Sequence, residues 1–165
     1  MTTDYFNLPD GVEDILSERA LELESLRRTL IDLYSKKGFC LVYPSIIEYA
    51  DAIGGDVNSE LKERAFTFSD NSISNDIAIR PDISQQIARI DQANNSKEIK
   101  KYCYAGEVIK KRKDSFAKSI LAIKSGVEIF GSDNSEIEIL DLLLESLDSV
   151  AVSYTHLRAH ETYPH

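Results

Sequence analysis

Residues 101–131, KYCYAGEVIKKRKDSFAKSILAIKSGVEIFG, constrain the fold more than any other part of this chain. Aromatic and small apolar residues fill 102–109, and a second apolar run at 120–130 follows a lysine-rich polar segment at 110–118. Two apolar runs of strand length on either side of a polar segment predict antiparallel strands joined by a loop.

The segment before this hairpin, residues 77–89 (IAIRPDISQQIAR), predicts a short apolar strand that ends at Pro81. A short amphipathic helix is expected to follow at 82–91. Asp82 with Gln85 three residues later has the pattern of a capping box, in which side chains bond the free N–H groups at a helix start. This segment therefore predicts a strand and a helix in direct succession.

A long helix is predicted near the N-terminus, at residues 18–37, with Ser17 or Asp14 as its N-cap and Gly38 as its stop. Its apolar stripe at helical spacing consists of Leu23, Leu26, Leu30, Leu33 and Tyr34. The next apolar run, FCLVYPSIIEY, predicts a strand that is interrupted at Pro44.

Two further elements complete the expected fold. Residues 66–80 resemble a hairpin with its turn in the polar residues 70–75. A final helix is predicted at 135–150, where Ser135 and Glu138 again form a capping-box pattern. The stripe of this helix that we expect to be buried consists of Ile137, Leu140, Leu143, Leu144 and Leu147.

Composition limits the classes of function. The chain has 165 residues, and no apolar run approaches the roughly 20 residues of a membrane span. A net charge of −9 argues against a nucleic-acid binder, whose affinity rests on neutralising phosphates. Cys40 and Cys103 lack CxxC spacing, which predicts free thiols without a metal in a cytoplasmic protein.

The C-terminal residues differ in character from the rest. Residues 152–162, VSYTHLRAHET, resemble the translation of a transposon-type sequencing adapter. We therefore expect residues 1–151 to be a partial natural domain and residues 152–165 to be a non-native tail. All three histidines of the chain lie in this tail, so no metal or acid–base role is expected of them.

The succession of helix, glycine, aromatic strand and proline in residues 18–44 resembles motif 1 of class II aminoacyl-tRNA synthetases, and residues 101–131 resemble motif 2. The segments LPDGVED and IAIRPD are similar to the histidyl-tRNA synthetase branch. The resemblance implies an α+β fold, in which an antiparallel sheet flanked by helices forms the N-terminal part of a catalytic-like domain. It also implies dimerisation through motif 1.

Residues needed for ATP chemistry differ from the family pattern. In the family, an arginine four residues after the motif 2 glycine binds phosphate, and a glutamate two residues later reads adenine. Counting from Gly106 places Lys110 and Arg112 at these positions. Lysine lacks the planar fork that meets phosphate with two hydrogen bonds, and arginine in place of glutamate reverses the charge. These departures predict that the chain does not form an adenylate.

The resemblance further implies a histidine-binding site at Asp82, Ser84, Lys110, Lys124 and Glu128. Acids at the positions of Asp82 and Glu128 hold the α-ammonium and the imidazole in the family. Ser84 replaces a threonine there, and Lys124 replaces a glutamine. Structural roles are open as well: Asp82 as a helix cap, Lys124 and Glu128 as a neutralising pair, and the lysine-rich loop as a solvated turn.

The segments LPDGVED, CYAGEVI and GVEIFG are most similar to a family of synthetase-like regulatory subunits, those of ATP phosphoribosyltransferase. This resemblance implies a non-catalytic, cofactor-free dimer that associates with the short-form catalytic subunit in the first step of L-histidine biosynthesis, with L-histidine as feedback inhibitor. One alternative is a fragment of a divergent histidyl-tRNA synthetase that activates histidine with ATP and charges tRNA. Another is a synthetase-like binding protein with a different partner.

Overall fold

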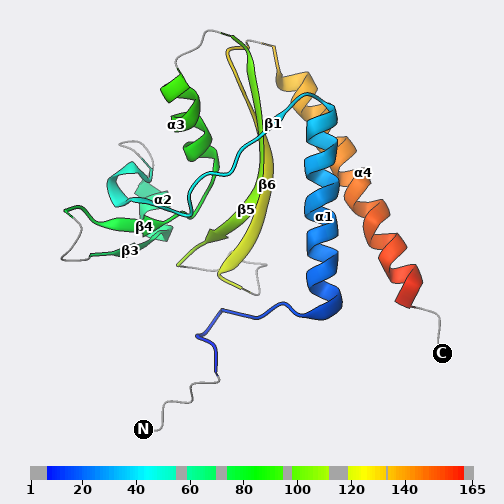
Figure 1. Ribbon diagram of the computed structural model, residues 1–165, viewed down its shortest axis with the longest axis horizontal. Coiled ribbons are helices and arrows are strands. Elements are labelled where there is room, and N and C mark those ends of the chain that lie inside the picture. Colours follow the sequence, from blue (N-terminus) through cyan, green and yellow to red (C-terminus); the bar gives the residue numbers. More distant parts are fainter. Residues whose placement is uncertain are drawn as a thin grey trace. The chain divides into compact units, whose positions relative to one another are not determined.

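A computed structural model describes residues 7–54, 59–69, 74–94, 98–111, 119–132 and 134–161, with side chains described up to residue 151 apart from Ser59. Figure 1 shows the course of the chain through its helices and strands. Contacts divide the chain into two units. The first unit comprises Met1–Asp14, Pro44–Gln86 and Gly106–Lys124, and the second comprises Ile15–Tyr43, Ile87–Ala105 and Ser125–His165.

The predicted hairpin is present as two neighbouring strands, β5 (Lys100–Ile109) and β6 (Leu121–Phe130), and each contributes to both units. The chain leaves the second unit along β5 and returns to it along β6, so these neighbours run in opposite directions. The backbone N–H of Lys110 donates to the carbonyl of Ile120 across the pair at 3.0 Å. The loop predicted between the strands lies almost entirely outside the described residues.

The second unit contains two helices that pack together, α1 (Ser17–Lys36) and α4 (Glu136–Glu161), and most of α3 (Ser84–Asn94). The short strand β1 (Cys40–Leu41) pairs in parallel with β5, and the sheet order is β1-β5-β6. The sheet is therefore mixed at this edge rather than wholly antiparallel, although the α+β class is as predicted. The buried core of this unit consists of Tyr34, Phe39, Cys103 and Leu142.

The first unit contains an antiparallel sheet in the order β2-β4-β3, made of β2 (Ile47–Tyr49), β4 (Ile77–Ile79) and β3 (Phe66–Phe68). The break predicted at Pro44 is real, because β1 and β2 belong to different sheets. A short 3-10 helix (Ala50–Ala52) and α2 (Ser59–Arg64) follow β2. The buried core of this unit consists of Ile53, Ala65 and Ala78.

The residues predicted as the N-cap of α1, Ser17 or Asp14, are wrong. Leu16 is the N-cap and provides no side-chain hydrogen bond, and Ser17 has a positive φ of 50°. The C-terminal stop is as predicted, since Gly38 has φ of 85°, a conformation that favours glycine. Phe39 N–H then closes the turn by donating to Tyr34 O at 3.1 Å.

The stripe predicted to be buried on the last helix is exposed. Among the side chains of α4 that the structure describes, Leu142 and Ser146 are buried instead, at 4% and 7% exposure. The hydrophobic pattern identified the apolar side of the helix but not the side that the rest of the unit covers. The predicted capping-box partners also point elsewhere: Glu138 accepts from Lys101 Nζ at 2.6 Å, and Gln85 Oε1 accepts from Gly54 N at 2.7 Å.

None of the described helices combines the length and apolar character that a bilayer crossing requires. Within the same residues, no three histidine, cysteine or acidic side chains gather as metal ligands. The helical backbone of α4 continues through the predicted boundary at residue 151, and the non-native origin of residues 152–165 stays a prediction.

Candidate functional site

A buried arginine organises the candidate site of the first unit. Arg80 follows β4 and is only 6% exposed. Its Nε donates to Glu107 O at 2.7 Å, and its Nη1 donates to Pro44 O at 2.8 Å and to Gln86 Oε1 at 3.3 Å. Burial lowers the pKa of Arg80, although the charges of Glu107 and Glu48 oppose this effect. Arg80 therefore ties the connection after β1, the strand β5 and the start of α3 to the end of β4.

Gly106 leaves room for this arginine. A Cβ atom added at Gly106 would lie 2.6 Å from Arg80 Nη2 and 3.5 Å from Ile83 Cδ1. The smaller distance is well below van der Waals contact, so a side chain at residue 106 and the present position of the guanidinium exclude each other. The glycine of the motif 2-like segment thus has a local structural reason in this chain.

Asp82 forms the polar centre of the site. Its Oδ1 accepts hydrogen bonds from the backbone N–H groups of Ile83 at 2.5 Å and Ser84 at 2.9 Å, so it caps α3 as predicted. Lys124 Nζ lies 2.7 Å from both carboxylate oxygens. Burial on its own would raise the pKa of Asp82, but the bonds from Lys124 and the backbone outweigh it and hold the pKa below its ordinary value.

The predicted site residues are only partly brought together. Ser84 and Lys124 meet at Asp82, in the first unit. Lys124 bonds Asp82 rather than Glu128, which lies in the part of β6 that belongs to the second unit. Lys110 lies one residue beyond the end of β5, and Arg112 falls outside the described residues.

Space beside Asp82 is small. The cavity that Asp82 lines together with Glu48, Arg80 and Gln86 has a volume of about 10 Å³. That volume is close to the minimum that a single buried water needs. As folded, the carboxylate is occupied by the chain's own ammonium group, and an amino acid could enter only if Lys124 moved away.

Arg80 and Gln86 are buried polar side chains of this site that sequence reasoning did not single out. Gln86 Nε2 donates to Ser45 O at 2.7 Å, so both side chains hold the connection that follows Pro44. The only signal for Arg80 in the sequence is a cation between an apolar strand and a proline. That pattern does not by itself indicate burial.

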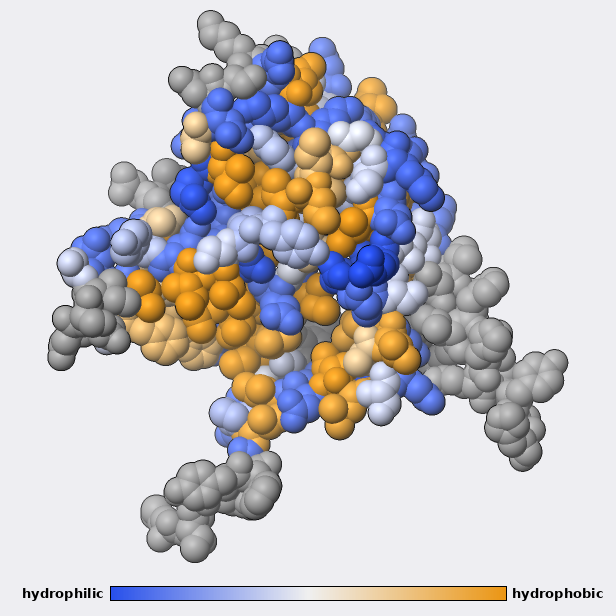
Figure 2. Space-filling model, in the orientation of Figure 1, coloured by the Kyte–Doolittle hydropathy of each residue, from blue (hydrophilic) through white to orange (hydrophobic). Residues whose placement is uncertain are grey.

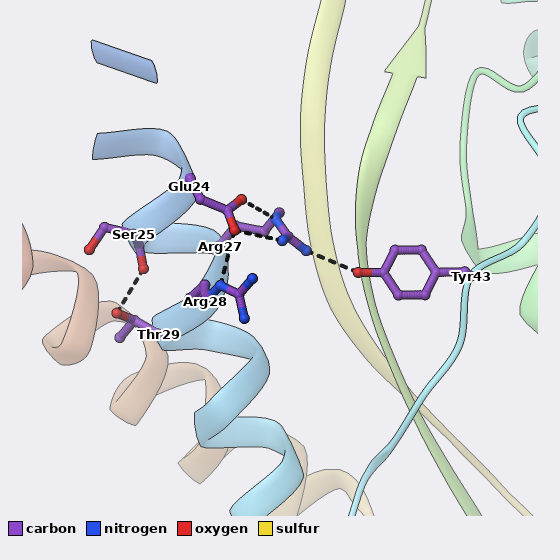
Figure 3. Close-up of polar contacts among 6 residues, drawn as sticks. All are labelled: Glu24, Ser25, Arg27, Arg28, Thr29 and Tyr43. Carbon is purple, nitrogen blue, oxygen red and sulfur yellow. Dashed lines mark hydrogen bonds and ion pairs between the residues drawn. The ribbon is translucent and has the colours of Figure 1, made fainter. Parts of the chain in front are cut away.

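A second polar group lies in the second unit, within the segment that resembles motif 1 (Figure 3). Arg27 Nε and Nη2 donate to the carboxylate of Glu24 at 2.7 and 2.8 Å, and Nη1 donates to Tyr43 Oη at 3.1 Å. The hydrogen bonds that Arg27 donates to Glu24 are the main reason that the pKa of Arg27 is raised. Arg28 also bonds Glu24 at 3.1 Å. This network holds Tyr43, which is 71% exposed, beside α1.

Solved structures resemble the fold. A histidine–tRNA ligase subunit from Alicyclobacillus acidocaldarius has a TM-score of 0.76 at 18% identity, over 92% of this chain and 44% of that one. A Bacillus halodurans protein described as an ATP phosphoribosyltransferase regulatory subunit/histidyl-tRNA synthetase has a TM-score of 0.75 at 20% identity, over 91% of this chain and 39% of that one. At these identities the likeness establishes the fold alone, and both proteins have the class II synthetase-like fold that the sequence predicts.

Curated proteins with related sequences are more similar to this chain than these solved structures are. A protein of Hahella chejuensis named ATP phosphoribosyltransferase regulatory subunit is 34% identical over 94% of this chain and 39% of its own length. One of Thiobacillus denitrificans with the same name is 36% identical over 91% of this chain and 48% of its own length. The chain thus spans less than half the length of these curated relatives. A family model described as histidyl-tRNA synthetase matches residues 11–160, and the chain therefore belongs to the histidyl-tRNA synthetase family.

Proposed function

We propose that this chain is part of a non-catalytic regulatory subunit that enables a separate, short-form ATP phosphoribosyltransferase in the first step of L-histidine biosynthesis. The names of the relatives support this function. The observation that carries the non-catalytic role is the ion pair between Lys124 and Asp82 at 2.7 Å. In the synthetases that the chain resembles, the acid at this position holds the substrate, whereas here the chain's own ammonium group occupies it.

Self-association through the motif 1-like segment is part of this proposal. Leu21 on α1 and Tyr43 beside it are 72% and 71% exposed, and both belong to the same unit. Large apolar and aromatic side chains of this kind are typical of protein interfaces. A dimer would bury them, while the Glu24–Arg27 pair keeps the Tyr43 hydroxyl bonded.

Histidine binding at Asp82, Ser84, Lys110, Lys124 and Glu128 stays a prediction. Binding at Asp82 would require the ligand's ammonium group to displace Lys124. The displaced lysine could then meet the ligand's carboxylate. This exchange supplies a physical route for histidine to alter the first unit, and it needs no chemistry on the ligand.

The deciding experiment mixes this protein with the short-form catalytic subunit from the same genome and measures phosphoribosyl-ATP formation with and without histidine. We expect formation to require this protein and to fall when histidine is added. Catalysis that is independent of this protein would contradict the proposal. Histidine-dependent exchange of pyrophosphate into ATP by this protein alone would instead support a divergent histidyl-tRNA synthetase.

A further inference from the structure

The chain passes between the first and the second unit at five points, here called passages. The first-unit residues at the passages are, in chain order, Asp14, Pro44, Gln86, Gly106 and Lys124. The last four of them contact one short segment of the same unit, residues 80–82. Three consecutive residues therefore hold four passages, and each of these contacts lies within the first unit.

Arg80 holds three of the passages through its guanidinium group. Its Nη1 donates to Pro44 O at 2.8 Å and to Gln86 Oε1 at 3.3 Å. Its Nε donates to Glu107 O at 2.7 Å, and the neighbouring Gly106 leaves room for Nη2. Because the three nitrogens belong to one planar group, they move together. A displacement of the guanidinium would therefore disturb all three passages at once.

Asp82 holds the fourth passage. Lys124 Nζ lies 2.7 Å from both oxygens of its carboxylate, and Lys124 is the last residue of β6 in the first unit. The same carboxylate caps α3, the helix in which the chain passes to the second unit after Gln86. Pro81 joins Asp82 to Arg80, and its ring restricts the backbone between the two side chains. The four passages thus depend on one stiff piece of chain.

Polar bonds, rather than apolar packing, make most of these contacts. Figure 2 shows apolar residues gathered at several places on the surface that it draws. Arg80 and Gln86, in contrast, are buried polar side chains, at 6% and 2% exposure. Buried hydrogen-bonding groups are costly to leave without partners, so their network favours one arrangement of the segments that it joins. Networks of this kind can carry a local change from one part of a protein to another.

We propose that residues 80–82 couple the two units, so that loosening this segment in the first unit also loosens parts of α3, β5 and β6 that belong to the second. Those parts are residues 87–94, 100–105 and 125–130. A group that drew Lys124 away from Asp82 would release β6 at its passage and would act on the other passages through the same segment. The coupling does not depend on the proposed role in histidine biosynthesis.

Hydrogen exchange of the whole chain, read by mass spectrometry, tests the coupling because it reports local opening segment by segment. Lys124→Met removes the ammonium group and keeps a long unbranched side chain. Asp82→Asn keeps an oxygen that can accept the backbone hydrogen bonds at the start of α3. Each variant should speed exchange of residues 87–94 and 125–130 by about three- to fivefold, as expected for loss of a partly exposed ion pair.

Ala65→Gly is the matched control. Ala65 lies in the buried core of the first unit and outside residues 80–82. Removal of its methyl group should speed exchange within the first unit, because the core there loses packing. It should leave the exchange of residues 87–94 and 125–130 as it is in the parent. Circular dichroism confirms that each variant keeps its fold.

Two results would overturn the proposal. Unchanged exchange of residues 87–94 in both Lys124→Met and Asp82→Asn would make the ion pair a local contact without influence on the other passages. An equal rise for residues 87–94 in the Ala65→Gly control would show that any loss of stability in the first unit reaches the second, and residues 80–82 would then have no special part in it.

Discussion

Replacing Gly106 with alanine should destabilise the protein, and the cause should be Arg80. Gly106 is not among the residues with positive φ, so alanine meets no backbone strain there. On conformational preference alone, alanine in a strand interior would gain roughly 0.5–1 kcal/mol over glycine. The new Cβ, however, would lie 2.6 Å from Arg80 Nη2, so the guanidinium must move.

Movement of the guanidinium has a cost because the group is held on two sides. Its Nε and Nη1 donate to Glu107 O and Pro44 O, and the residue is 6% exposed. Hydrogen bonds from a charged donor contribute about 1.5–3 kcal/mol each. Loss of one such bond exceeds the gain from alanine, and we expect the free energy of unfolding to fall by about 1–2 kcal/mol.

A double-mutant cycle isolates this cause. Urea unfolding should be followed by far-UV circular dichroism, since the chain contains no tryptophan. In an Arg80→Ala background the guanidinium is absent, so Gly106→Ala should be neutral or stabilising by about 0.5–1 kcal/mol. The reasoning would be refuted if Gly106→Ala cost the same free energy in both backgrounds.

Three further predictions follow from the same structure. Although burial opposes it, the hydrogen bond from Lys124 holds the pKa of Asp82 below its ordinary 3.8, so the Asp82 carboxylate stabilises the fold above that pH, and this stability is lost as the pH falls below it. Lys124→Met should reduce this loss of stability in acid, and urea midpoints that change equally with pH in the variant and the parent would contradict it. A Cβ at Gly126 would lie 2.6 Å from the hydroxyl of Tyr104, so Gly126→Ala should cost about 1–3 kcal/mol and Tyr104→Phe should recover part of it, as thermal unfolding of the single and double variants would reveal. Resequencing the gene should replace residues 152–165 with a different natural continuation, and natural codons for VSYTHLRAHET would disprove the adapter origin.

The helix-cap role of Asp82 at the candidate site was predictable because its signal is local. Asp82 lies beside a helix start, and its Oδ1 accepts hydrogen bonds from the backbone N–H groups of Ile83 and Ser84. The partner of Lys124 was not predictable. Glu128 lies four residues away in the same strand, whereas Asp82 lies 42 residues away and meets Lys124 only in the folded chain. Arg80 was missed for the same reason, since the carbonyls that bury it belong to distant segments.

Sequence alone determined the elements of this protein: the hairpin of β5 and β6, the helix that stops at Gly38 and the break at Pro44. Each follows from spacing or from the backbone limits of glycine and proline, which act within a few residues. Tertiary structure decided the parallel pairing of β1 with β5 and the buried side of α4. Periodicity reveals that a helix has an apolar side, but only packing determines which side is covered. On α4 the covered side contains Leu142 and Ser146, and the more apolar side is exposed.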